Sequence, residues 1–138
     1  RENAEILIDV PPDLTFEADE KKIATVIDTM LSNAVNYSTP PRKIRIGYQS
    51  SSYDKLHRLS IQDNGFGITD TQLDEIFEPF QQPENGNIGK KKTERIGLSL
   101  SIAKKYVKMH KGYISVDSIV NIGSTFSIHL PKQKPAEL

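Results

Sequence analysis

A short segment with an acidic residue and two glycines, Asp63-Asn64-Gly65-Phe66-Gly67, has the residue types best suited to bind a ligand. The acidic residue ends an alternating apolar stretch, and the glycines let the backbone turn sharply and approach a ligand closely. A buried carboxylate there can accept a hydrogen bond from an exocyclic amine such as that of adenine. Guanine offers a carbonyl oxygen at that place, which leaves the buried acceptor unpaired. The alternative interpretation is a plain Asp-Asn-Gly turn.

Polar residues also border the apolar face of a predicted helix. Thr29, Asn33 and Asn36 recur at i, i+4 and i+7, so they share one edge of that helix. An asparagine oxygen is a suitable hard ligand for Mg²⁺ when phosphates and water complete the octahedron. Solvated helix positions are the alternative interpretation.

A third candidate is Gly97-Leu98-Ser99-Leu100, which we expect to open a second long helix directly after a loop. The free N–H groups and the dipole of a helix start favour phosphate binding. A simple helix entry at Gly97 explains the same residues equally well.

The first half of the chain predicts three strands and two helices around these candidates. The apolar run Ile6–Ile8, stopped by Pro11-Pro12, predicts an edge strand. Three- and four-residue apolar steps predict a helix from Asp19 to about Tyr37, which Pro40-Pro41 prevents from continuing. Alternating residues from Ile44 to Tyr48 and from Leu59 to Ile61 predict a hairpin, and a short helix follows near 70–76.

The second half predicts a loop, a helix and a closing hairpin. Residues 81–95 lack periodicity, which is typical of a long mobile loop. Leu98, Ile102, Tyr106 and Val107 indicate one face of the second helix, which we expect Gly112 to end. Strands at Ile114–Val116 and Phe126–Leu130 follow, so the order of elements predicts a mixed sheet with helices on one face.

The composition fits one soluble domain without a strong overall field. The 138 residues are 36% apolar, and the 18 basic residues balance the 18 acidic ones. We therefore expect neither a nucleic-acid partner nor membrane contact by this domain. No cysteine is available for disulfides or thiolate chemistry. Because the sequence opens at Arg1 without a methionine, we expect a piece of a longer protein. We separately expect the domain to be cytoplasmic, in a parent that is either soluble or membrane-anchored.

Five sequence blocks, taken together and in order, resemble the ATP-binding catalytic domain of sensor histidine kinases, of the superfamily with the Bergerat fold. The blocks are Asn33-Ala34-Val35-Asn36-Tyr37-Ser38, Asp63-Asn64-Gly65-Phe66-Gly67-Ile68, Ile76-Phe77-Glu78-Pro79-Phe80, Gly97-Leu98-Ser99-Leu100-Ser101-Ile102-Ala103-Lys104 and Gly123-Ser124-Thr125-Phe126. The resemblance covers about Asp19 to Pro131. It implies a two-layer α/β (α+β) sandwich, with a mixed, mostly antiparallel sheet covered on one face by helices.

The resemblance also implies a binding site for ATP and Mg²⁺. Asp63 would contact the adenine amine, Asn33 would hold the metal, and residues 80–96 would form an ATP lid anchored by Phe77 and Phe80. No catalytic residue is assigned with certainty. The implied nucleotide contacts are Asn33, Asn36, Tyr37, Asp63, Gly65, Gly67, Ile68, Phe80, Arg95, Gly97, Leu98, Ser99 and Thr125.

Departures from the family pattern put phosphate binding in doubt. The family usually has Asn at the place of Thr29 and a basic residue at the place of Asn36. Of three alternating glycines before the second helix only Gly97 is kept, with Arg95 and Ser99 at the other places. Arg95 and the neighbouring lysines are candidate replacements for the missing cation, or else an ordinary solvated lid.

The three histidines do not resemble the family's phosphoacceptor, which an acidic residue follows; here His57, His110 and His129 precede Arg, Lys and Leu. The resemblance therefore implies a histidine kinase domain that phosphorylates a histidine on the parent's dimerisation domain, with a response regulator receiver domain as downstream partner. A nucleotide- or protein-binding module without catalysis is the alternative. A gyrase- or chaperone-type ATPase is disfavoured because Thr29 stands where a glutamate base is needed. A serine kinase of the mitochondrial dehydrogenase-kinase or anti-sigma type stays open.

Overall fold

The fold was analysed in a computed structural model that describes residues 4–51, 53, 55–77 and 90–132, with side chains except those of 51 and 90–99. Within these ranges five strands and three helices follow one another. They are β1 (Ala4–Asp9), α1 (Glu20–Tyr37), β2 (Arg42–Ser51), β3 (Leu56–Asp63), α2 (Asp70–Leu73), α3 (Lys90–Met109), β4 (Tyr113–Ile119) and β5 (Gly123–Pro131). The predicted strands and helices are all present, and the differences concern boundaries.

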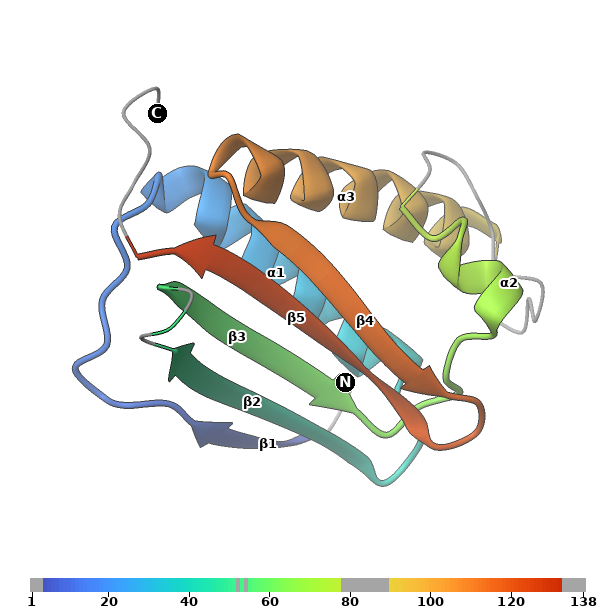
Figure 1. Ribbon diagram of the computed structural model, residues 1–138. Coiled ribbons are helices and arrows are strands. Elements are labelled where there is room, and N and C mark those ends of the chain that lie inside the picture. The colour runs from blue at the N-terminus through green and yellow to red at the C-terminus, as the bar shows by residue number, and fades with distance from the viewer. Residues whose placement is uncertain (1–3, 52, 54, 78–89, 133–138) are drawn as a thin grey trace.

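The strands form one mixed sheet in the order β1-β2-β3-β5-β4. The strand β1 pairs in parallel with β2, and the other neighbours pair antiparallel. Both long helices lie against the same face of the sheet, and within the described ranges the other face carries no helix (Figure 1). The predicted class, a mixed and mostly antiparallel sheet covered on one face by helices, is confirmed.

The helix α1 has the boundaries that its sequence dictates. The Asp19 side chain caps its start by accepting a hydrogen bond from the Lys22 N–H at 3.0 Å, and Ser38 ends it two residues before Pro40. Its buried stripe, Ile23, Val26, Met30, Asn33 and Ala34, packs onto inward side chains of the sheet. Asn33 is the polar member of this stripe, which places an amide at the interface between helix and sheet.

The helix α3 begins seven residues earlier than its sequence suggested. Its first residue is Lys90 and not Gly97, because the stretch Lys90–Ile96 contains good helix formers and neither glycine nor proline. The predicted position of Gly97 at a helix start is therefore wrong, and the seven residues before it in the predicted lid are helical. The buried face consists of Leu100, Ala103 and Val107, whereas Ile102, predicted on that face, is 38% exposed.

The end of α3 is closed by Lys111 and not by Gly112 itself. Lys111 adopts the left-handed conformation with φ of 64°, its N–H bonds the Lys108 carbonyl, and the Gly112 N–H bonds the Val107 carbonyl. These two bonds form a Schellman motif, which usually places glycine at the left-handed position. Gly112 is needed for a different reason, since a Cβ atom there would overlap the His129 carbonyl oxygen.

A buried imidazole ties the two long helices together. His110, 1% exposed, accepts a hydrogen bond from the Asp19 N–H through Nε2 at 2.9 Å. Its Nδ1 lies 2.9 Å from the Tyr106 carbonyl oxygen, which can only accept. The proton therefore sits on Nδ1, and the ring joins the start of α1 to the end of α3.

Candidate functional site

Asp63 ends β3 as a buried carboxylate, 7% exposed, on the helix-covered side of the sheet. Its Oδ1 accepts hydrogen bonds from the Gly65 N–H at 2.8 Å and from the Ser124 N–H at 3.4 Å. Burial raises the pKa of Asp63, and these two backbone donors oppose the rise. Within the described part of the chain both bonds go to Oδ1, so Oδ2 can accept a hydrogen bond from a ligand.

Three glycines allow main chain to close tightly around Asp63. A Cβ atom on Gly65 would overlap the Tyr37 carbonyl oxygen at the end of α1. On Gly67, which has φ of 76°, it would overlap the Ile119 carbonyl oxygen, and on Gly123 that of Asp63 itself. No other residue fits these positions without movement of the backbone. The predicted sharp turn at Gly65 and Gly67 is confirmed, whereas the predicted close approach to a ligand stays a prediction.

Asn64, in the same turn, is hydrogen-bonded to the segment that connects α1 to β2. Its Oδ1 accepts from the Lys43 N–H at 3.2 Å, and its Nδ2 donates to the Pro41 carbonyl oxygen at 2.8 Å. The Thr39 hydroxyl donates to the Asn64 carbonyl oxygen at 3.0 Å. The side chain of Asn64 is thus used for structure, and it fixes the turn to the connection between α1 and β2.

Two polar side chains near the end of α1 have buried atoms without a hydrogen-bond partner among the described residues. The Asn33 side chain is 5% exposed, and its Nδ2 has no hydrogen-bond partner among the described residues. The Tyr37 hydroxyl, one helical turn further on, also lacks a partner there, and burial raises the pKa of Tyr37 to about 12. Buried polar groups without partners are rare and costly in proteins. These two atoms therefore indicate a place for a polar ligand; Thr29 and Asn36 lie half-buried on the same helix.

The hairpin of β4 and β5 contributes a residue that sequence reasoning missed. Asp63 pairs with Ser124, whereas Thr125 pairs with Gln62 and points to the uncovered face of the sheet. The predicted nucleotide contact of Thr125 is therefore not made by its side chain, and the neighbouring Ser124 N–H reaches Asp63 instead. The sequence does contain a signal for Ser124. Phe126, Ile128 and Leu130 alternate as inward-pointing residues, so the even-numbered Ser124 is expected on the same face.

Other predicted site residues take supporting positions or fall outside the described residues. Ile68 packs against the core and donates its N–H to the Ser118 Oγ at 2.6 Å. Phe77 lies at the edge of the core, with the Lys104 ammonium 5.5 Å from its ring centroid. Phe80 lies outside the described residues, as do the side chains of Arg95, Leu98 and Ser99; the backbone of Arg95, Gly97, Leu98 and Ser99 is part of α3.

The site carries local negative charge. Segments 63–77 and 113–131 contain five acidic residues and neither lysine nor arginine. The last turn of α1 contains no basic residue, and the negative end of its dipole points toward the Gly65 turn. An amine or a metal ion is favoured here, whereas phosphate groups require cations from another element.

All three histidines have structural roles, as expected from their sequence contexts. The His57 Nδ1 lies 2.6 Å from the Tyr48 hydroxyl, and the His129 Nε2 lies 2.9 Å from the Ser115 Oγ. Both residues are 8% exposed, and the His110 ring joins the helices as described above. None presents a free nitrogen at the surface near Asp63.

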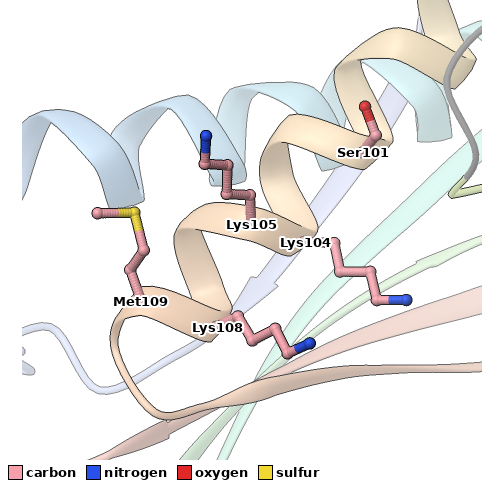
Figure 2. Close-up of a pocket in the computed structure, with 5 residues that line it drawn as sticks. All are labelled: Ser101, Lys104, Lys105, Lys108 and Met109. Atoms are coloured by element: carbon pink, nitrogen blue, oxygen red, sulfur yellow. The ribbon is translucent and has the colours of Figure 1, made fainter.

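The hollow shown in Figure 2 lies elsewhere, on the outer side of α3. It has a volume of about 440 Å³ and is lined by Ser101, Lys104, Lys105, Lys108 and Met109. None of the predicted nucleotide contacts whose side chains the structure describes lines it. We assign the candidate site to the end of β3, on the contacts and orphaned polar atoms around Asp63.

The described residues contain no group of three or more His, Cys, Asp or Glu side chains that could hold a metal ion. They also contain no helix long and apolar enough to cross a bilayer.

Comparisons with known proteins identify the family to which the chain is similar. Residues 18–134 match the family described as histidine kinase-, DNA gyrase B- and HSP90-like ATPase. The sensor protein RprX of Bacteroides fragilis is 36% identical over 117 residues, which cover 85% of this chain and 22% of that protein. The sensor histidine kinase WalK of Bacillus subtilis is 32% identical over 125 residues, covering 91% and 20%. This chain thus spans about a fifth of the length of both relatives.

Solved structures show the same fold. The catalytic domain of histidine kinase ThkA, in a nucleotide-free form, superposes with a TM-score of 0.76 and 26% identity, covering 94% of this chain and 79% of that one. A mycobacterial sensor histidine kinase, MprB, has a TM-score of 0.79 at 24% identity, covering 96% and 86%. The sheet with its helix layer is shared with both.

Proposed function

This chain belongs to the family of histidine kinase-, DNA gyrase B- and HSP90-like ATPases, and we propose that it is the ATP-binding catalytic domain of a sensor histidine kinase. Its task would be to hold ATP and Mg²⁺ for in-line transfer of the γ-phosphoryl group to a histidine on a separate domain. The relatives named as a sensor protein and as a sensor histidine kinase, each several times longer than this chain, support a parent with a dimerisation domain. A response regulator receiver domain is the proposed downstream partner.

The proposal depends mainly on one observation: the structure contains the buried Asp63 carboxylate and also two buried polar atoms of α1 without a hydrogen-bond partner among the described residues, Asn33 Nδ2 and the Tyr37 hydroxyl. Asp63 Oδ2 would accept the adenine amine, and the Tyr37 hydroxyl, which stays protonated, would donate to the nucleotide. Asn33 would offer its amide oxygen to Mg²⁺, because a half-turn about χ2 exchanges its two ends. The metal supplies charge neutralisation for the phosphates.

Titration calorimetry with the folded chain tests the adenine assignment. ATP with Mg²⁺ should bind more tightly than GTP with Mg²⁺, and Asp63→Asn should weaken ATP binding by about 1–3 kcal/mol, as expected for a spoiled buried polar contact. The Asn64→Asp variant, which changes the hydrogen bonds of Asn64 and not the proposed contact, should retain the preference for ATP if it folds. Equal affinity of Asp63→Asn and the original chain for ATP would remove the assignment.

A second candidate function is a nucleotide-binding module without catalysis. The lack of a basic residue in the last turn of α1, together with Thr29 and Asn36 at family metal and cation positions, favours it. Phosphorylation of the parent's dimerisation domain, supplied in trans with ATP and Mg²⁺, separates the two. We expect slow but detectable transfer; tight nucleotide binding without transfer would select the second candidate.

A further inference from the structure

The turn between β4 and β5 exposes three large aliphatic side chains, Ile119, Val120 and Ile122, which we call the hairpin tip. Their exposed fractions are 62%, 47% and 64%. Tight turns are usually built from Gly, Pro, Asn, Asp and Ser, and adjoining exposed apolar side chains mark interaction surfaces. Three such residues within four positions therefore require an explanation that the nucleotide site does not give.

The hairpin tip is held rigidly by its own backbone. The Ile122 N–H donates to the Ile119 carbonyl oxygen at 3.0 Å, and the Asn121 N–H donates to the Phe66 carbonyl oxygen at 2.6 Å. The Ile68 N–H bond to Ser118 Oγ, at 2.6 Å, holds the same two segments together one strand position earlier. Because both segments are fixed, the aliphatic side chains cannot fold back into the core.

Along the two segments that meet at the hairpin tip the charged side chains are all acidic, and the basic residues Arg42 and Lys43 lie two strands away from β5 at the same end of the sheet. Residues 63–77 and 113–131 carry five acidic residues and neither lysine nor arginine. Asp117, two residues before Ile119, is exposed, and so is Asp70, two residues after Ile68. An apolar surface with an acidic rim is complementary to an apolar anchor flanked by basic residues.

We propose that the hairpin tip is a docking surface for a protein segment that combines an apolar anchor with flanking lysine or arginine residues. A second copy of this chain is a poor occupant, because a two-fold contact would bring the two Asp117 carboxylates together. An anionic membrane would be repelled by the acidic rim. The proposal rests on exposure and charge, and it holds whether or not the chain binds ATP.

Four synthetic peptides of equal length test this surface with the isotope-labelled chain. Each peptide has a central anchor and flanking residues. Three have leucine anchors, flanked by lysine, by glutamate or by glutamine, and the fourth has serine in place of leucine with lysine flanks. The leucine–lysine peptide should shift the amide resonances of residues 117–123 and bind at least tenfold more tightly than each of the others. Failure of this peptide to bind at millimolar concentration, or equal binding of the leucine–glutamate peptide, would overturn the proposal.

Matched variants locate the effect. Ile119→Ser with Ile122→Ser should weaken the leucine–lysine peptide at least tenfold, whereas Ile6→Ser with Ile8→Ser, on exposed residues of β1, should leave it unchanged. Asp70→Asn with Asp117→Asn should weaken it about threefold and reduce its salt dependence. Equal losses in both serine variants would overturn the proposal. So would a concentration-dependent dimer abolished only by the first serine pair, or adsorption of the chain to phosphatidylglycerol vesicles through the same residues.

Discussion

Gly123 lies so close to Asp63 that a Cβ atom at position 123 would overlap the Asp63 carbonyl oxygen. The two residues belong to different strands, β5 and β3, and they meet where both strands reach the candidate site. This approach brings the Ser124 N–H to the Asp63 carboxylate. The close approach of Gly123 thus sets the position of the proposed adenine acceptor.

We expect Gly123→Ala to lower the free energy of unfolding by about 2–3 kcal/mol, because its φ of 152° and the neighbouring backbone both disfavour a side chain. Urea unfolding measures the change. Gly47→Ala is the matched control, since its nearest neighbour is the Ser60 Oγ at 3.1 Å, which can move aside. Its effect should stay within roughly 0.5 kcal/mol. Equal effects of the two variants would contradict the close packing of Gly123.

Asp63→Asn should leave the chain at least as stable at neutral pH while it loses nucleotide affinity. Burial raises the pKa of Asp63, so the folded state holds the proton more tightly than the unfolded state. Stability is therefore lost as pH rises from the ordinary carboxyl range through the raised pKa, and the neutral amide escapes this loss. Urea unfolding at about pH 3 and about pH 7 should show the advantage of the variant only at the higher value. A variant less stable than the original chain at neutral pH would contradict this account.

Asn33→Ala should weaken ATP binding in the presence of Mg²⁺ by about 1–2 kcal/mol while adenosine binding stays unchanged, because its proposed contact is to the metal. Calorimetry with ATP, with and without Mg²⁺, and with adenosine measures both effects. Ser32→Ala, at an exposed position of the same helix, is the control. Parallel losses for ATP and adenosine would indicate damaged packing of α1 in place of a lost metal ligand.

His110→Ala should destabilise the chain by about 2–4 kcal/mol, because it leaves a cavity and removes the hydrogen bonds to Asp19 and Tyr106. Thermal unfolding is the measurement. Met109→Ala, which truncates the 38% exposed neighbour, should cost much less. Affinity for ATP in the folded His110→Ala chain should be unchanged, since the imidazole lies at the opposite end of α3 from the residues proposed to bind nucleotide.

The chain incubated alone with ATP and Mg²⁺ should not phosphorylate itself on histidine. Each of its three histidine residues is at least nine-tenths buried and hydrogen-bonded within the fold. Acid-labile phosphate, measured after quenching at alkaline pH, should stay at background. Label on His57, His110 or His129 would contradict their structural assignment.

Local patterns predicted most of the fold and part of the site. The apolar steps of α1 and its Asp19 cap gave the right boundaries, because burial and capping act there in the same direction. The start of α3 was predicted at Gly97 because glycine is common at helix ends, whereas the helix-forming residues before it extend the helix to Lys90. The left-handed Lys111 has no sequence signal, since the following Gly112 matches the usual motif better.

In the candidate site, too, features set by neighbouring residues could be predicted from the sequence, and contacts between distant residues could not. Asp63 and the glycines after it were identified because strand end and turn are adjacent in sequence. The contact of Ser124 with Asp63 depends on a register between strands 61 residues apart, which no local pattern contains. The orphaned atoms of Asn33 and Tyr37 could not be foreseen either, because satisfaction of a buried group depends on all of its neighbours.

The parallel pairing of β1 determines how attached segments would reach this domain. Ala4 pairs with Arg42, at the end of the sheet where Asp63 lies, whereas Pro131 pairs with Leu56 at the far end. Figure 1 shows β1 starting and β5 finishing at these opposite ends. Eight residues of β3 separate them, or about 25 Å. A domain joined shortly before Ala4 would be tethered beside the proposed nucleotide, and one joined after Pro131 would start a full strand length away from it.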